Sequence, residues 1–223
     1  MEFYHDLITE KSFKTLQQLK NKYNFILIGG WAIFLYSKTL KSKDIDLIID
    51  YDELDKLRKD FQLFKNERLK KYEIKIEGID IDIYLPHFSK LGFPIEEIKN
   101  YCQSIEGFLA PIPEILLIMK VFTFNERKGT TKGKKDLIDI FSLLKEEKIN
   151  PVRDYRTKEK TQGKQISNGI DWQKYKELVR KYNLIEVNQK FKELVSSAKA
   201  IPELGLLNHQ IAKLKREVLK NLR

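Results

Sequence analysis

Two alternating segments on either side of Gly78 restrict the fold of this chain more than any other feature. Tyr72–Glu77 and Ile79–Leu85 both place apolar residues at every second position, which is typical of half-buried strands. Gly78 provides the turn between them. Pro86 ends the second strand, because proline has no amide hydrogen to donate to a neighbouring strand. The sequence therefore predicts an antiparallel hairpin within a small sheet.

Three further strands and several helices are predicted around this hairpin. Phe25–Ile28 is a short apolar run that ends at Gly29-Gly30, and a helical segment follows at Trp31–Ser37. Asp44–Asp50 alternates acidic and apolar residues and predicts a second strand, and Phe108–Ile112 predicts a short edge strand. Two more helices are predicted to begin at a capping residue: one runs from Ser12 to Tyr23, and one from Asp52 through Phe64. In the second half of the chain, helices are predicted over Pro94–Ser104, from Pro113 through Phe124 and from about Lys134 to Glu147. The last three are predicted from Asp171 through Tyr182, over Glu186–Ser197 and over Pro202–Leu222. This order predicts an α+β fold, with a small mixed sheet followed by a helical C-terminal half.

The composition is that of a globular protein of a reducing compartment. A chain of 223 residues can bury a core, and 42% hydrophobic with 33% charged residues is far from a disordered composition. No apolar stretch approaches the ~20 residues needed to span a bilayer. The first residues lack the basic start of a signal peptide, and the single cysteine, Cys102, excludes an intramolecular disulfide. We therefore expect a cytoplasmic protein that has no contact with a membrane.

The charge of the chain favours polyanionic partners. Lys and Arg number 42 against 32 Asp and Glu, which leaves a net charge of +10. Each phosphate contact by a basic side chain releases condensed counterions, so such a surplus supports binding of nucleic acid. A solvated basic surface without any nucleic-acid partner is the alternative interpretation.

Two glycines and a set of carboxylates carry the chemical information. Gly29 and Gly30 lack a Cβ, so their backbone can approach a phosphate group closely at the N-terminus of a helix. Asp44 and Asp46 lie two positions apart on a strand and place both carboxylates on one face. These carboxylates repel each other unless a cation lies between them, and Mg²⁺ prefers carboxylate and phosphate oxygens. A third carboxylate on a neighbouring strand would complete a two-metal clamp for displacement at phosphorus.

Asp80 and Asp82 are the two candidates for this third carboxylate, because both lie on the same face of the predicted strand. The context Ile83-Tyr84-Leu85-Pro86 favours Asp82, and Asp80 is then a solvated residue at the rim. A Gly-Gly turn or an Asp-Ile-Asp strand is commonplace when it occurs alone. Together with a third acidic strand, they would form a site suited to displacement at phosphorus.

The chain resembles the DNA polymerase β-like nucleotidyltransferase superfamily over about residues 25–147. The resemblance rests on Leu27-Ile28-Gly29-Gly30, on Lys41-Ser42-Lys43-Asp44-Ile45-Asp46-Leu47-Ile48 and on Asp82-Ile83-Tyr84-Leu85-Pro86. The helical segment is similar to the branch that contains AbiEii-type toxins and other stand-alone nucleotidyltransferases. Its pattern runs from Pro113-Glu114 through Lys120 and Arg127 to Lys135-Asp136-Leu137-Ile138-Asp139-Ile140 and Leu143-Leu144.

The resemblance implies a division of labour between a metal site and a phosphate site. Asp44 and Asp46 would bridge two Mg²⁺ ions, and Asp82 would bind the catalytic ion and help to deprotonate the attacking hydroxyl group. The β- and γ-phosphates of an NTP would be held by Gly29, Gly30 and Ser42, with Lys120 contacting the triphosphate from the helical side. The acceptor would receive a nucleoside monophosphate, and pyrophosphate would leave.

We expect the chain to divide into four parts. Residues 1–112 would form the nucleotidyltransferase core, and residues 113–150 a helical segment that completes the active-site cleft. Residues 151–170 are expected to form a basic loop or linker, and residues 171–223 a C-terminal helical region.

Lys120 is either functional or a surface lysine. We expect Asp136 and Asp139 to lie on the helix surface or to cap the helix, with a catalytic role as the alternative. We expect Arg127 to begin a basic loop through Lys135.

The acceptor is less well defined by these residues. The basic segment and the surplus charge favour RNA, such as the 3′ end of a tRNA, while a protein hydroxyl or a small molecule such as an aminoglycoside remains open. A role like that of AbiEii toxins would imply a cognate antitoxin as a partner. A different class of function is a non-catalytic module that retains the fold and binds nucleotides or nucleic acid.

Overall fold

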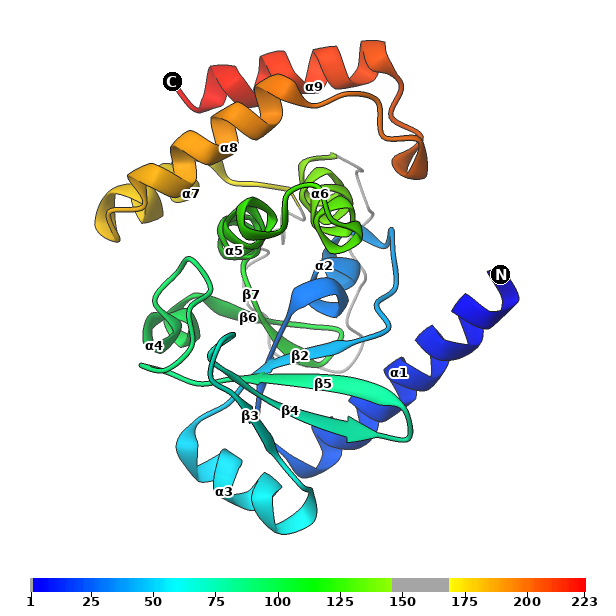
Figure 1. Ribbon diagram of the computed structural model, residues 1–223. Coiled ribbons are helices and arrows are strands. Elements are labelled where there is room, and N and C mark those ends of the chain that lie inside the picture. Colours follow the sequence, from blue (N-terminus) through cyan, green and yellow to red (C-terminus); the bar gives the residue numbers. More distant parts are fainter. Residues whose placement is uncertain (1, 146–168) are drawn as a thin grey trace, which may run out of the picture.

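A small mixed sheet forms the centre of the protein, as the computed structural model shows (Figure 1). The structure describes the backbone of residues 2–145 and 169–223 and the side chains from residue 6 onwards. Most of the predicted basic loop, residues 151–168, lies outside the described residues. The sheet has the strand order β1 (Ile26–Ile28), β2 (Ile45–Ile48), β5 (Ile79–Tyr84), β4 (Lys71–Ile76) and β3 (Phe64–Asn66). Only β2 and β5 run parallel to each other, so the predicted α+β fold with a mixed sheet is confirmed.

Helices enclose the sheet and continue into a separate layer at the C-terminal end. Figure 1 shows α2 (Gly29–Ser37), α5 (Pro113–Arg127) and α6 (Thr131–Leu144) above the sheet, with α1 (Glu2–Lys22) and α3 (Tyr51–Asp60) below it. The C-terminal layer consists of α7 (Trp172–Lys181), α8 (Ile185–Ser197), the short helix η2 (Pro202–Leu204) and α9 (Asn208–Asn221). Both α7 and α8 pack on α5, so this layer covers the side of α5 that is remote from the sheet.

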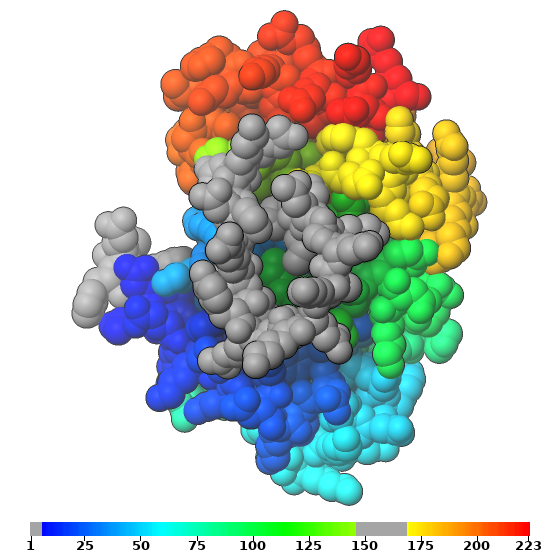
Figure 2. All heavy atoms as spheres, turned by 180° about the vertical axis from the view of Figure 1, so that it is seen from behind, coloured from blue at the N-terminus to red at the C-terminus, as the bar shows by residue number. Residues whose placement is uncertain are grey.

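The C-terminal helices gather at one end of the molecule and the N-terminal half at the other, as the view from behind shows (Figure 2).

A helical segment and a pair of strands connect the sheet to α5. The helical turn α4 (Ile95–Ile98) continues as η1 (Lys99–Tyr101), and β6 (Cys102–Ile105) pairs with β7 (Phe108–Pro111) in a second, two-stranded sheet. Among the helices in the described part of the chain, none combines the length and apolar character that a bilayer span requires.

The predicted hairpin is confirmed and divides the side chains of β5 between two environments. Ile79, Ile81 and Ile83 are buried in the core, whereas Asp80 and Asp82 point to the opposite face. Ile81 pairs with Ile45 of β2, so the buried isoleucines continue the core across the sheet. The burial of alternate residues therefore fixes the face on which the acidic side chains stand.

Several predicted element boundaries were wrong, and tertiary contacts explain them. Ser12 does not cap a helix, because α1 begins at Glu2 and the buried Ser12 Oγ accepts a hydrogen bond of 2.9 Å from Trp31 Nε1. Asp52 lies inside α3, whose N-cap is Asp50, and Phe64 leaves the helical pattern to pair with Glu73 in an edge strand.

The predicted helix over Pro94–Ser104 ends at Tyr101, because the next residues pair with β7. The predicted helix over Pro202–Leu222 is interrupted at Gly205, which has a φ of +64°. The predicted loop through Lys135 is mostly helix, because Thr130 caps α6 by accepting from the amide of Gly133 at 3.0 Å.

Candidate active site

The sheet register brings the predicted carboxylates to one end of a single cavity. Asp46 of β2 pairs with Ile28 of β1 on one side and with Asp82 of β5 on the other. Neighbouring strands are about 5 Å apart, so the carboxylates of Asp46 and Asp82 stand side by side on one face. Asp44 immediately precedes β2, and all three acids line a cavity of about 460 Å³. Asp80 lies outside this cavity, is well exposed and pairs with Lys75 at 3.1 Å.

Burial and a neighbouring carboxylate disfavour the ionisation of both Asp46 and Asp82. Burial deep in the molecule raises the pKa of Asp46, although the ammonium groups of Lys120 and Lys135 act in the opposite direction. Burial and the proximity of Asp46 raise the pKa of Asp82 to about 6. A pair of acids held in this way favours a cation, because a positive charge between them relieves both the repulsion and the loss of hydration.

The donor atoms of the cavity suit Mg²⁺, but the carboxylate of Asp82 is paired with a lysine. Asp44, Asp46 and Asp82 supply only carboxylate oxygens, which are the ligands that Mg²⁺ prefers. Within residues 6–145 and 169–223, no three His, Cys, Asp or Glu side chains are grouped tightly enough to hold a metal ion. The carboxylate of Asp82 is instead engaged in an ion pair, with its Oδ2 2.5 Å from Nζ of Lys71.

The paired glycines make room for two side chains of the cavity. Gly29 has a φ of +66°, and a Cβ at this position would lie 2.0 Å from Oδ2 of Asp46. A Cβ on Gly30 would lie 2.8 Å from Oγ of Ser42. Both positions therefore need glycine so that Asp46 and Ser42 can pack against the start of α2.

The N-terminus of α2 opens at the same end of the cavity. Ile28, at the N-cap position, offers no side-chain acceptor to the first amides of the helix, and the first turn contains no acidic residue. Gly29, Gly30 and Ser42 all line the cavity. Free amides at a helix N-terminus attract anions, so this end of the cavity can bind a phosphate group.

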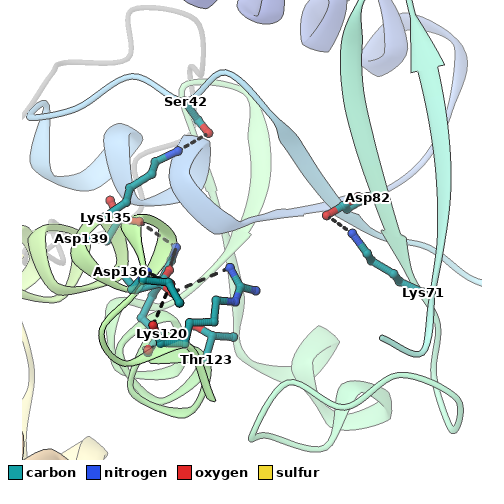
Figure 3. Close-up of polar contacts among 11 residues, drawn as sticks. Ser42, Lys71, Asp82, Lys120, Thr123, Lys135, Asp136 and Asp139 are labelled. Atoms are coloured by element: carbon teal, nitrogen blue, oxygen red, sulfur yellow. Dashed lines mark hydrogen bonds and ion pairs between the residues drawn. The ribbon is translucent and has the colours of Figure 1, made fainter. Parts of the chain in front are cut away.

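Two lysines of the helical side line the cavity, and Figure 3 shows Lys135 against Ser42 and Lys120 against Asp136. Lys135 of α6 places its Nζ 3.2 Å from Oγ of Ser42. Lys120 of α5 is mostly buried, with its Nζ 2.9 Å from Oδ1 of Asp136 and 2.7 Å from Oδ2 of Asp139. The prediction that these two aspartates lie on the helix surface or cap the helix was wrong. Both are buried, and they hold the ammonium group of Lys120 between α5 and α6.

Several residues of the cavity were not predicted as site residues from the sequence. Lys71 and Tyr84 line it next to Asp82, and exposed basic residues surround its opening. Burial, together with the carboxylates of Asp46 and Asp82, raises the pKa of the Tyr84 hydroxyl. Lys71 and Tyr84 stand on the face that carries Asp82, so the strand alternation contained the signal that could have identified them.

Similar solved structures include three proteins at low sequence identity. JHP933 from Helicobacter pylori is 15% identical, with a TM-score of 0.48 over 99% of this chain and 92% of that chain. The antibiotic-resistance factor ANT(2'')-Ia is 16% identical, with a TM-score of 0.44 over 65% of this chain and 86% of that chain. An antigenic nucleotidyltransferase-like protein from Paracoccidioides brasiliensis is 18% identical, with a TM-score of 0.39 over 62% of this chain and 76% of that chain.

Sequence comparison gives the family of the chain. No protein with a curated description matches the chain significantly in sequence. Residues 7–190 match a family described as "Nucleotidyltransferase of unknown function (DUF6036)". This match spans the sheet, the three helices α2, α5 and α6 above it and all the residues that line the cavity. The chain therefore belongs to this family of nucleotidyltransferases.

Proposed function

We propose that this protein transfers a nucleoside monophosphate from an NTP to an acceptor hydroxyl group, with Asp44, Asp46 and Asp82 as ligands for two Mg²⁺ ions. The observation that carries the proposal is the register of β2 and β5, which sets Asp46 beside Asp82 on the cavity face of the sheet. Mg²⁺, when bound, would neutralise charge on the reacting phosphate and favour attack by the hydroxyl.

The triphosphate would lie between the start of α2 and the lysines of the helical side. Gly29, Gly30 and Ser42 supply amides and a hydroxyl, and Lys135 reaches the same hydroxyl from α6. Lys120 supplies a positive charge whose position is set by two buried aspartates. This grouping of donors supports a site for the β- and γ-phosphates, because phosphate oxygens bind amides and cations.

The chemistry requires one bond to form and one to break. The acceptor oxygen bonds to the α-phosphorus, and the bond from this phosphorus to the bridging oxygen breaks, so that pyrophosphate leaves. The hydroxyl proton goes to a carboxylate oxygen of Asp82.

We propose RNA as the acceptor, with the 3′ end of a tRNA as the leading candidate. Exposed cations from three separate segments stand around the opening of the cavity: Arg68 in the β3–β4 turn, Lys90 after β5 and Lys132 in α6. The whole chain carries a net charge of +10. An acceptor with several phosphates could contact all three cations at once, which supports a polyanion over a neutral molecule.

A toxin-like role with a cognate antitoxin is a narrower form of this proposal. Its support is the resemblance of the segment from Pro113 to Leu144 to the AbiEii-type branch. Lys120, Lys135 and Asp136 of that segment line the cavity, and Asp139 contacts Lys120. Growth arrest on expression of the wild-type protein, absent with Asp46→Asn, is the result expected of a toxin.

The test is transfer of a radiolabelled α-phosphate from each ribonucleoside triphosphate to fractionated RNA, to protein and to small molecules. We expect one NTP to label RNA. Asp44→Asn and Asp46→Asn should reduce the rate by about a thousandfold, because each removes about 4 kcal/mol of transition-state stabilisation. Asp80→Asn is the matched control, since Asp80 stands on the same face of β5 outside the cavity.

Two other outcomes identify the competing functions. Labelling of protein or of a small molecule would replace RNA as the acceptor and leave the reaction type intact. Binding of nucleic acid that is sensitive to salt and unchanged by Asp46→Asn, without any labelling, would favour a non-catalytic binding module.

A further inference from the structure

Lys71 is a buried cation placed against the carboxylate that the proposed reaction needs. Its side chain is 10% exposed, and its Nζ lies 2.5 Å from Oδ2 of Asp82 (Figure 3). The ammonium group of Lys71 is thus paired with Asp82 in a mostly buried position. Asp82 therefore already has a counter-ion when no metal is bound.

A second acid lies within reach of the same ammonium group. Glu73 of β4 pairs in register with Asp82 of β5, and its Oε1 is 3.0 Å from Nζ of Lys71. Asn66 donates to the same Oε1 at 2.9 Å, which fixes the position of the Glu73 carboxylate. Asp46, Asp82 and Glu73 thus form a row across three neighbouring strands, and Lys71 bridges the last two.

We propose that Lys71 is a positioning residue that competes with the divalent cation for Asp82 and moves to Glu73 when the metal binds. The move is small, because the ammonium group already touches Glu73 and needs no new partner. It leaves no buried charge without a counter-ion, since Glu73 retains Lys71 and Asp82 gains the metal. This inference rests on the proposed function, in which Asp82 is a metal ligand.

The competition has a consequence for the order of binding. In the protein without nucleotide, a free divalent cation must displace Lys71 from Asp82 with only the carboxylates to hold it. An NTP adds phosphate oxygens to the ligands, so a metal that arrives with the nucleotide displaces the lysine more easily. Lys71 therefore favours occupation of the site by the metal–nucleotide complex over occupation by the metal alone.

The test is the affinity for Mn²⁺ alone, measured from the electron paramagnetic resonance signal of the free ion. Lys71→Met should tighten Mn²⁺ binding by at least about tenfold, because it removes the competing charge at contact distance from Asp82. The addition of a non-hydrolysable NTP analogue should improve Mn²⁺ binding less in this variant than in the wild type. Lys71→Arg retains the competing charge and should bind Mn²⁺ much as the wild type does.

Lys75→Met is the matched control for the loss of positive charge. Lys75 lies on the same face of β4, and it pairs with the exposed Asp80 outside the cavity. Its effect on the Mn²⁺ affinity should stay within about twofold, because solvent screens this pair. Near-ultraviolet circular dichroism of each variant shows whether its tertiary packing is intact.

Glu73→Gln gives a second test that does not require removal of the buried lysine. This variant lacks the carboxylate to which Lys71 would move, so Mn²⁺ binding should weaken by about tenfold when Lys71 is present. The effect of Glu73→Gln should largely disappear when it is combined with Lys71→Met, because no ammonium group then has to move. Asp80→Asn is the control for loss of a negative charge on the same face.

The outcomes separate this inference from the proposed function. If Lys71→Met weakens Mn²⁺ binding or leaves it unchanged, while Asp46→Asn abolishes binding, the metal site stands and the competition by Lys71 is wrong. If neither the wild type nor any variant binds Mn²⁺, even with the NTP analogue, the proposed metal-dependent function fails as well. Equal effects of Glu73→Gln in both backgrounds would also overturn the role of Glu73 as the receiving acid.

Discussion

The substitution Gly29→Ala tests the contact between the start of α2 and Asp46. An alanine at a φ of +66° adopts the left-handed conformation at a cost of about 1–2 kcal/mol. Its Cβ would also lie 2.0 Å from Oδ2 of Asp46, so the carboxylate or the helix must move. Overpacking of this kind costs about 1–3 kcal/mol. We therefore expect a loss of about 2–5 kcal/mol in the free energy of unfolding.

Gly78→Ala separates these two contributions. Gly78 has a φ of +86°, and a Cβ there would meet no atom within 4 Å, so this variant has the backbone strain without the clash. It should lose about 1–2 kcal/mol and retain the wild-type affinity for Mn²⁺. Unfolding in urea gives the free energy of unfolding of each variant, and the resonance signal of free Mn²⁺ gives the affinity.

The two measurements together can refute the reasoning. Gly29→Ala should be less costly in an Asp46→Ala background, because the closest clashing atoms are then absent. The argument is wrong if Gly29→Ala costs no more than Gly78→Ala and binds Mn²⁺ as the wild type does. It is also wrong if the cost of Gly29→Ala is the same in both backgrounds.

Three further predictions concern buried polar groups. Lys120→Met leaves two buried aspartates without their main counter-ion and should lower the free energy of unfolding by about 3–5 kcal/mol in urea titrations. Ser12→Ala leaves Nε1 of Trp31 without its acceptor and should cost about 1–3 kcal/mol in the same assay. Burial raises the pKa of Glu114, so its contribution to stability is present below its ordinary pKa and is lost as the pH rises through the raised value. Glu114→Gln should remove this pH dependence while its amide oxygen still accepts from the backbone of Asp171, and a series of thermal midpoints against pH checks it.

The strands of the site could be predicted from the sequence because their burial alternates. Ile79, Ile81 and Ile83 must all enter the core, and this requirement alone places Asp80 and Asp82 on the other face. The strand pattern alone does not decide between Asp80 and Asp82 as the third carboxylate. It depends on the length of β2 and on its parallel register with β5, which brings Asp82 opposite Asp46. Parallel pairing joins segments that are distant in sequence, so local patterns do not determine it.

The environment of Lys120 in α5 could not be predicted from the sequence for a similar reason. Asp136 and Asp139 are three positions apart, which on an isolated helix is typical of a solvated face. They are buried because α5 packs against this face of α6 and brings Lys120 to them. Ser12 was assigned as a cap from its residue type, whereas its hydroxyl accepts from the Trp31 ring on a different helix. In each case the partner comes from elsewhere in the fold.

The most direct test of the proposed reaction is a comparison of two labels on the NTP. The protein is incubated with Mg²⁺, fractionated RNA and the NTP labelled either at the α-phosphate or at the γ-phosphate. Nucleotidyl transfer predicts that the α label enters the RNA and the γ label leaves as pyrophosphate, in both cases only when Asp46 is present. Entry of the γ label into the acceptor, or labelling that persists in Asp46→Asn, would contradict it.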